Sequence, residues 1–143
     1  MMIISIIIWA VSVIIAALYY KSSLQKLRTP YTFSYIASEY QLGTYHMPLF
    51  IATKLAPLLI VVELLSAVWI VLPWTRLYGF ILGASLQLVF FALMFTNMGR
   101  SFPYGCGCFK MNAPSVVTAR HAWGNLVLCF VQIAVVIWIV VVG

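Results

Sequence analysis

Charged residues are scarce in this chain, and their scarcity decides the solvent in which it folds. Only 7% of the 143 residues are charged, whereas 65% are hydrophobic and the mean hydropathy is +1.11. A chain of this size cannot hide so much apolar surface inside one small water-soluble core. The composition therefore excludes a soluble globular protein and predicts an integral membrane protein.

Cysteine is also scarce, since the chain has only three. Three thiols cannot build a framework of structural disulfides, so any pair of them needs another explanation. The sequence also lacks internal repeats, low-complexity tracts and a second compositionally distinct region, which predicts one membrane domain over residues 1–143. No basic face could be presented away from the bilayer, so the net charge of +6 does not indicate nucleic-acid binding.

Four apolar stretches are long enough to cross a bilayer as helices, which takes about 20 residues each. They are residues 2–20, 49–72, 77–98 and 122–142. Only Lys54 and Glu63 are charged within them. The first stretch has no Lys or Arg ahead of it and no small-x-small cleavage pattern after it, so we expect a retained span. The pattern predicts an all-α bundle of four transmembrane helices with up-down connectivity.

The first loop, residues 21–48, carries the signals of a short helix. Thr29 is a suitable cap before Pro30, and Gly43 is a stop signal. Apolar side chains between them recur at helical spacing, at Phe33, Ile36, Ala37 and Tyr40. We expect this helix to lie at the membrane interface, where tyrosine suits the headgroup region.

The basic residues outside the spans are distributed unequally. With four spans, the first and third loops share one side of the membrane, opposite to the turn that contains Arg76. The first and third loops hold six cations: Lys21, Lys26, Arg28, Arg100, Lys110 and Arg120. The positive-inside rule therefore predicts that the third loop faces the cytoplasm.

The third loop contains Cys106-Gly107-Cys108, the feature with the most chemistry in this sequence. Nearby cations lower the pKa of a thiol, and Arg100 and Arg120 lie close along the chain. Residues two apart in a fully extended chain are separated by about 7 Å between Cα atoms, slightly beyond disulfide reach, so the backbone must bend at Gly107. A bridge over so short a segment is strained, and strained disulfides exchange readily. The motif thus favours a redox pair.

Two other interpretations of the cysteine pair stay open. Cys106 and Cys108 could ligate copper or zinc, which soft sulfur and imidazole favour. Further ligands would come from His46, His121, Met47, Met98 and Met111, none of which has a diagnostic spacing, so the sequence predicts no metal site. The thiols could also be small apolar residues without special chemistry.

Glu63 lies near the middle of its span, where an ionisable side chain is costly. Such a residue faces the bundle interior and has either a partner or a task, and protonation would lower its cost. Lys54 is half a helical rotation away, so we expect no direct pairing between them, although Pro57 stands between the two. Two interpretations follow: a proton-accepting or quinone-facing carboxyl, or a hydrogen bond to Gln87 or to the last helix.

Three small residues bear on helix packing. Gly79 and Gly83 form a small-xxx-small pair that lets another helix approach closely. Cys129, in the last span, is interpreted as a small packing residue, with a third redox thiol as the alternative.

The motifs together resemble the MauE family of methylamine-utilisation membrane proteins, within the DoxX-like superfamily. The resemblance rests on Gly99-Arg100, on Cys106-Gly107-Cys108-Phe109 and on the run Gly124 to Leu128. In the front half it rests on Lys26-Leu27-Arg28, Phe33, Tyr40, Pro57 and Glu63. It spans nearly the whole chain, and its most specific part is the Cys-Gly-Cys-Phe run between the third and fourth spans.

The resemblance implies a compact helical fold in a bacterial or archaeal cell membrane. It implies thiol–disulfide exchange at Cys106 and Cys108 with a thioredoxin-like partner during maturation of exported redox proteins, with quinone as a candidate electron carrier. Arg100 and Arg120 would stabilise the thiolate, and Glu63 would handle protons.

Two positions depart from the family pattern. Lys110 stands where Gly is common, and Gly124 stands where Arg is expected. Arg120 could supply that charge, because residues four apart share a helix face. The family role also favours a cysteine loop outside the cytoplasm, against the charge count. The main rival interpretation is a non-catalytic accessory or assembly subunit of a larger membrane complex.

Overall fold

Four long helices and one short helix make up the computed structural model. It describes residues 1–28, 30–39, 41–42, 45–46, 48–99, 101–102, 115–116 and 118–143. The helices are α1 (Met2–Arg28), α2 (Pro30–Glu39), α3 (Leu49–Val71), α4 (Arg76–Thr96) and α5 (Ala119–Val142). The strands are β1 (Gln41–Leu42), β2 (Tyr45–His46), β3 (Ser101–Phe102) and β4 (Ser115–Val116). These strands form only two antiparallel pairs, β1 with β2 and β3 with β4, so the predicted all-α class is confirmed.

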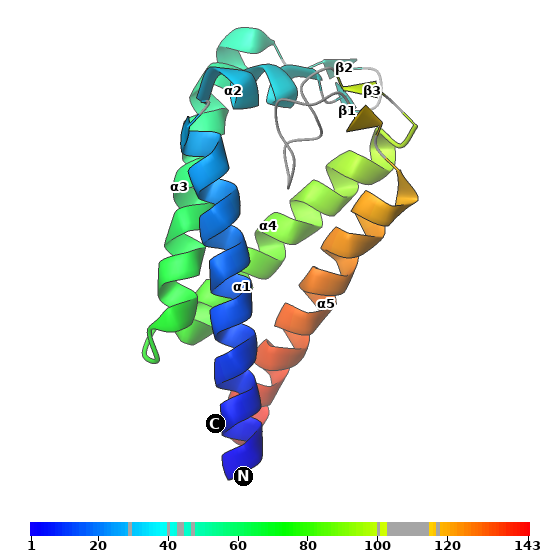
Figure 1. Cartoon of the computed structure of the whole chain (residues 1–143). Coiled ribbons are helices and arrows are strands. Elements are labelled where there is room, and N and C mark those ends of the chain that lie inside the picture. Colours follow the sequence, from blue (N-terminus) through cyan, green and yellow to red (C-terminus); the bar gives the residue numbers. More distant parts are fainter. Residues whose placement is uncertain are drawn as a thin grey trace.

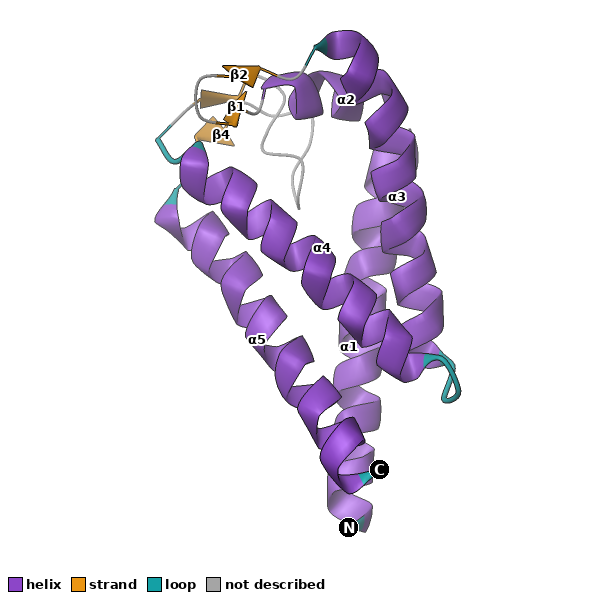
Figure 2. Ribbon diagram, turned by 180° about the vertical axis from the view of Figure 1, so that it is seen from behind, coloured by secondary structure: helices purple, strands orange, loops and turns teal. Residues whose placement is uncertain are grey.

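The helices form two halves that meet at one end. Helix α1 packs on α3, α3 packs on α4, and α4 packs on α5, while α2 lies across the beginning of α3. Both views show α4 and α5 diverging from α1 and α3 toward the end that carries α2 and the strands (Figures 1 and 2). We call this the loop end. The opposite end, which holds both chain termini and the turn between α3 and α4, is the turn end.

The apolar core is concentrated where the two halves converge. Side chains from α1, α3, α4 and α5 pack there into one cluster: Ile15, Ala16, Tyr19, Ala67, Ile70, Phe80 and Val135. A second cluster joins α4 to the start of α5 through Leu86, Phe90, Met94 and Ala122. Leu59 and Val62 of α3 pack against this second cluster, and the polar side chains described below lie in the same interior.

The outer surface is apolar along the long helices. Large hydrophobic side chains such as Ile7, Leu58, Leu88 and Ile137 are more than half exposed. Four helices, α1, α3, α4 and α5, are long and apolar enough to cross a membrane. Because lipid is the solvent that accepts such a surface, the chain is a multi-pass membrane protein.

Gly79 and Gly83 bring α4 against its neighbours, as their spacing predicts. A Cβ atom on Gly79 would lie 2.6 Å from the backbone nitrogen of Ile70 on α3. A Cβ atom on Gly83 would lie 2.9 Å from the Tyr19 hydroxyl on α1. Both distances are shorter than van der Waals contact, so only glycine permits this close approach.

Helix α1 continues past Tyr20, where its hydropathy falls, to Arg28. Ser22, Ser23 and Lys26 are all buried in this extension. The extension has a polar sequence, but one of its faces is buried in the bundle against α3. The chain thus keeps these polar residues within the protein and presents Lys21 and Arg28 outward.

A candidate functional site in the bundle interior

The cysteine pair itself lies outside the described residues, as do Arg100 and Lys110. The structure describes both ends of the loop that carries it. Strands β3 and β4 pair antiparallel, with Ser101 opposite Val116, so the segment leaves and returns at one place at the loop end. Arg120, in the first turn of α5, is exposed at the same end.

Glu63 has an ionic partner on another helix. The Lys26 Nζ atom donates a hydrogen bond to Glu63 Oε2 at 2.7 Å, and the two side chains are 1% and 3% exposed. The sequence-based alternatives placed its partner at Gln87 or on the last helix, but the partner is on α1. Lys54 is exposed and does not pair with Glu63, as expected.

Lys26 is the residue that sequence reasoning missed. It stands between Lys21 and Arg28, so it counts as one of several cations that set topology. Its long side chain instead reaches from the last turns of α1 to mid-α3, and Nζ also lies 5.0 Å from the ring centroid of Phe90 on α4. Such contacts stabilise a buried ammonium group. Burial of one member of an otherwise exposed basic group cannot be read from the sequence alone.

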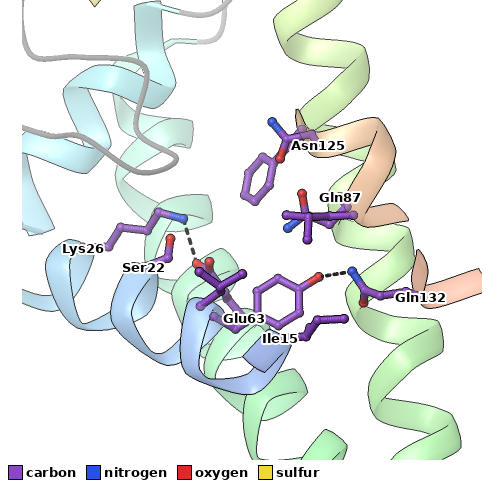
Figure 3. Close-up of a pocket in the computed structure, with 11 residues that line it drawn as sticks. Ile15, Ser22, Lys26, Glu63, Gln87, Asn125 and Gln132 are labelled. Carbon is purple, nitrogen blue, oxygen red and sulfur yellow. Dashed lines mark hydrogen bonds and ion pairs between the residues drawn. The ribbon is translucent and has the colours of Figure 1, made fainter. Parts of the chain in front are cut away.

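Tyr19 connects three helices close to the ion pair. Its hydroxyl donates to the Gly83 carbonyl oxygen on α4 at 3.0 Å and accepts from Gln132 Nε2 on α5 at 2.7 Å. Figure 3 shows Gln132 and Glu63 on opposite sides of the pocket. The α1 and α5 helices are therefore joined by hydrogen bonds at a depth where hydrocarbon offers none.

Asn125 adds a further buried amide, nearly two helical turns after the start of α5. Its Nδ2 atom donates to the His121 carbonyl oxygen at 3.1 Å and contacts Met94 Sδ at 3.0 Å. With Gln87 on α4, the four long helices each contribute a polar side chain to one small cavity (Figure 3). We call Tyr19, Lys26, Glu63, Gln87, Asn125 and Gln132 the polar cluster.

Among the described residues, no three His, Cys, Asp or Glu side chains come together to hold a metal ion. His121, a candidate ligand from the sequence, serves instead at the start of α5. Its Nδ1 atom lies 3.3 Å from the Thr118 backbone nitrogen and 3.1 Å from the Thr118 hydroxyl, which forms a capping box. Met47 and Met111 lie outside the described residues.

Cys129 is a buried free thiol, 4% exposed, in α5. Its Sγ atom lies 3.5 Å from the Ala84 carbonyl oxygen and donates to it across the α4–α5 contact. This is the environment of a small packing residue, which matches the first interpretation from the sequence.

Removing the Tyr19 hydroxyl tests the hydrogen bonds that link the helices. We expect Tyr19→Phe to lower the free energy of unfolding by about 1–2 kcal/mol, because Gln132 Nε2 then loses its acceptor in a buried site. Tyr20→Phe, on the 55% exposed neighbouring side chain, is the matched control and should change little. Unfolding in mixed micelles measures both, and equal effects of the two variants would contradict the assigned bonds.

Comparison with known proteins agrees with the resemblance found in the sequence. A search of curated proteins and a search of solved structures gave no match. Residues 4–140 match the model of one family, described as methylamine utilisation protein MauE. The matched range includes the Lys26–Glu63 pair and the Cys106-Gly107-Cys108 segment. Because the match covers nearly the whole chain, this membrane protein belongs to the MauE family.

Proposed function

We propose that this chain is a thiol–disulfide redox protein of the cell membrane, in which Cys106 and Cys108 exchange a disulfide with a thioredoxin-like partner. The exchange serves the maturation of exported redox proteins, in keeping with a family described by methylamine utilisation. One observation carries most weight: the ends of the cysteine segment are paired at the loop end of a bundle that buries an ionisable pair. A membrane protein keeps such a pair in its interior when the pair has a task.

The chemistry needs two electrons and two protons. In the oxidising direction, one partner thiolate attacks the Cys106–Cys108 disulfide and forms a mixed disulfide. The partner's second thiolate then attacks the mixed disulfide, so that the partner keeps the disulfide and Cys106 and Cys108 become thiols. A membrane quinone then takes two electrons and two protons from these thiols, which restores the disulfide and gives the quinol. The reducing direction is the same sequence reversed. Arg100 and Arg120 stabilise the thiolate in either direction.

Glu63 is suited to handle the protons of this cycle. Its carboxylate is held by the Lys26 ammonium group, and both lie in a polar cluster bounded by lipid-facing helices. A proton that reaches the cluster finds one acceptor, the carboxylate. Glu63 thus supplies a proton-accepting group at a depth that bulk water does not reach.

The test is capture of the mixed disulfide in cells. Cys106→Ser and Cys108→Ser, made separately, each leave one thiol of the pair, and one of them should accumulate a covalent complex with a thioredoxin-like protein on non-reducing gels. Maturation of the exported target should be lost in both. Cys129→Ser is the matched control, because its thiol is buried in the bundle, and it should behave like the wild type. If neither pair variant changes the partner's oxidation state or maturation, the proposal fails.

The apolar surface supports a second candidate function, an accessory or assembly subunit of a larger membrane complex. The outward faces of the long helices carry apolar side chains, and few of the described residues lie outside these helices. Such a subunit would co-purify with a multisubunit complex even after both Cys106 and Cys108 are replaced. Copper or zinc handling would instead show metal in the purified protein that the double substitution removes.

The side of the membrane that carries the cysteine loop is settled by labelling. An impermeant thiol reagent should modify Cys106 and Cys108 in intact cells if the loop faces outward, as the proposed exchange with exported proteins requires. Labelling only after permeabilisation would agree with the basic-residue count.

A further inference from the structure

The cavity of the polar cluster lies where α1, α3, α4 and α5 come together. The volume open to the centre of a water-sized sphere is about 10 Å³. This is close to the smallest space that holds one water molecule, and it is far below what an aromatic ring needs. The size therefore limits an occupant to water or to an ion of similar size.

Three amide oxygens of this cavity have no hydrogen-bond donor. They are Gln87 Oε1, Asn125 Oδ1 and Gln132 Oε1, on side chains that are 4%, 1% and 0% exposed. An unsatisfied polar atom in an apolar environment costs several kcal/mol. Three such atoms on side chains that line one cavity indicate a missing donor.

The neighbouring groups cannot supply that donor. Gln132 and Asn125 are held in their orientation by the bonds that their nitrogen atoms donate, so exchanging the oxygen and nitrogen of either amide would break those bonds. The Tyr19 hydroxyl already donates to Gly83, and the Lys26 ammonium group donates to Glu63 and to none of the three oxygens. The occupant must therefore bring hydrogen-bond donors of its own.

We propose that this cavity binds a water molecule, which donates one hydrogen bond to one of these amide oxygens and the other to the Glu63 carboxylate. Water supplies two donors and fits the volume. A metal cation would be repelled by the Lys26 ammonium group, and an anion would meet the Glu63 carboxylate and the amide oxygens. Buried water is retained in cavities whose polar groups have no other hydrogen-bond partner.

The water also gives Glu63 a route to α5, a role that rests on the proposed function. A proton that thiol oxidation releases and that enters the cavity is taken up by the water, which passes one of its protons to the Glu63 carboxylate and is left neutral. The cavity thus connects the carboxylate with the first turns of α5, which begin at the loop end.

Water-edited NMR of the full chain in nanodiscs tests the site directly. We expect magnetisation transfer from water to at least one of the side-chain amides of Gln87, Asn125 and Gln132, as strong as that to the exposed Trp74 indole. The backbone amide of Ile70, which is fully buried among apolar side chains, should show none. If the three amides behave like Ile70, the cavity is dry and the inference is overturned.

A variant that fills the cavity tests the bound water independently of the capture of the partner. Leu128→Phe adds volume at the cavity wall and should abolish the water signals, whereas Leu88→Phe, on the 54% exposed lipid face, should leave them unchanged. Leu128→Phe should also slow reoxidation of Cys106 and Cys108 at least several-fold without preventing capture of the partner. Reoxidation at the wild-type rate would overturn the relay role. Failure of partner capture in the cysteine variants would instead overturn the proposed function and leave the water signals intact.

Discussion

Glu63→Gln is expected to lower the free energy of unfolding by about 3–5 kcal/mol, because it leaves the Lys26 ammonium group buried without a counter-charge. Lys26 is 1% exposed, so solvent cannot stabilise the charge that remains. The Phe90 ring offers only a weaker attraction. Reversible unfolding in mixed detergent and SDS micelles gives the free energies to compare.

The double variant Lys26→Met/Glu63→Met should recover most of this loss. Replacing both members of a buried pair with apolar residues of similar size is often neutral, whereas removing one member is not. Lys54→Met is the matched control, since Lys54 is an exposed lysine on the same helix as Glu63, and a change of at most about 0.5 kcal/mol is expected. A double variant as unstable as Glu63→Gln would show that the loss does not come from an unpaired charge on Lys26.

Gly79→Ala is expected to destabilise the protein by about 2–3 kcal/mol. The new Cβ atom would lie 2.6 Å from the Ile70 backbone nitrogen and 2.8 Å from the Trp69 carbonyl carbon. Both are backbone atoms, so no side chain can rotate away, and α4 would have to move from α3. The same unfolding assay measures the loss, and the crossing of the two helices should change.

Gly124→Ala is the control for this prediction, because a Cβ atom on Gly124 meets nothing within 4 Å. Alanine is the better helix former, so this variant should be neutral or more stable by up to about 1 kcal/mol. Alanine would then destabilise the protein at Gly79 but not at Gly124, and the reason for the difference is steric. Equal stability of both variants would mean that the α3–α4 contact is looser than described.

Hydropathy and spacing predicted most of the architecture. The four spans, the helix before Gln41 and the close approach at Gly79 and Gly83 all follow from local rules. Backbone polar groups must be satisfied within the segment in lipid, so a long apolar stretch has few alternatives to a helix. The same rules underestimated α1, because its extension to Arg28 depends on burial against α3.

The candidate site was only partly predictable. Glu63 stands out in the sequence because an acidic residue in the middle of a span is costly. Lys26 does not, because it belongs to a basic segment whose members look alike. Gln132 and Asn125 are polar residues in an apolar span, but nothing in the sequence shows that both face Tyr19 and Gln87.

The sequence by itself determined the solvent of this protein, the number of its membrane spans and the place of the Cys-Gly-Cys segment between two of them. These properties depend on residues that are neighbours along the chain, so the sequence alone contains them. Only the tertiary structure decided which polar side chains meet, since Lys26 and Glu63 are 37 residues apart and Tyr19 and Gln132 are 113 apart. Such pairs depend on how the helices rotate and cross, and that is fixed by packing across the whole bundle.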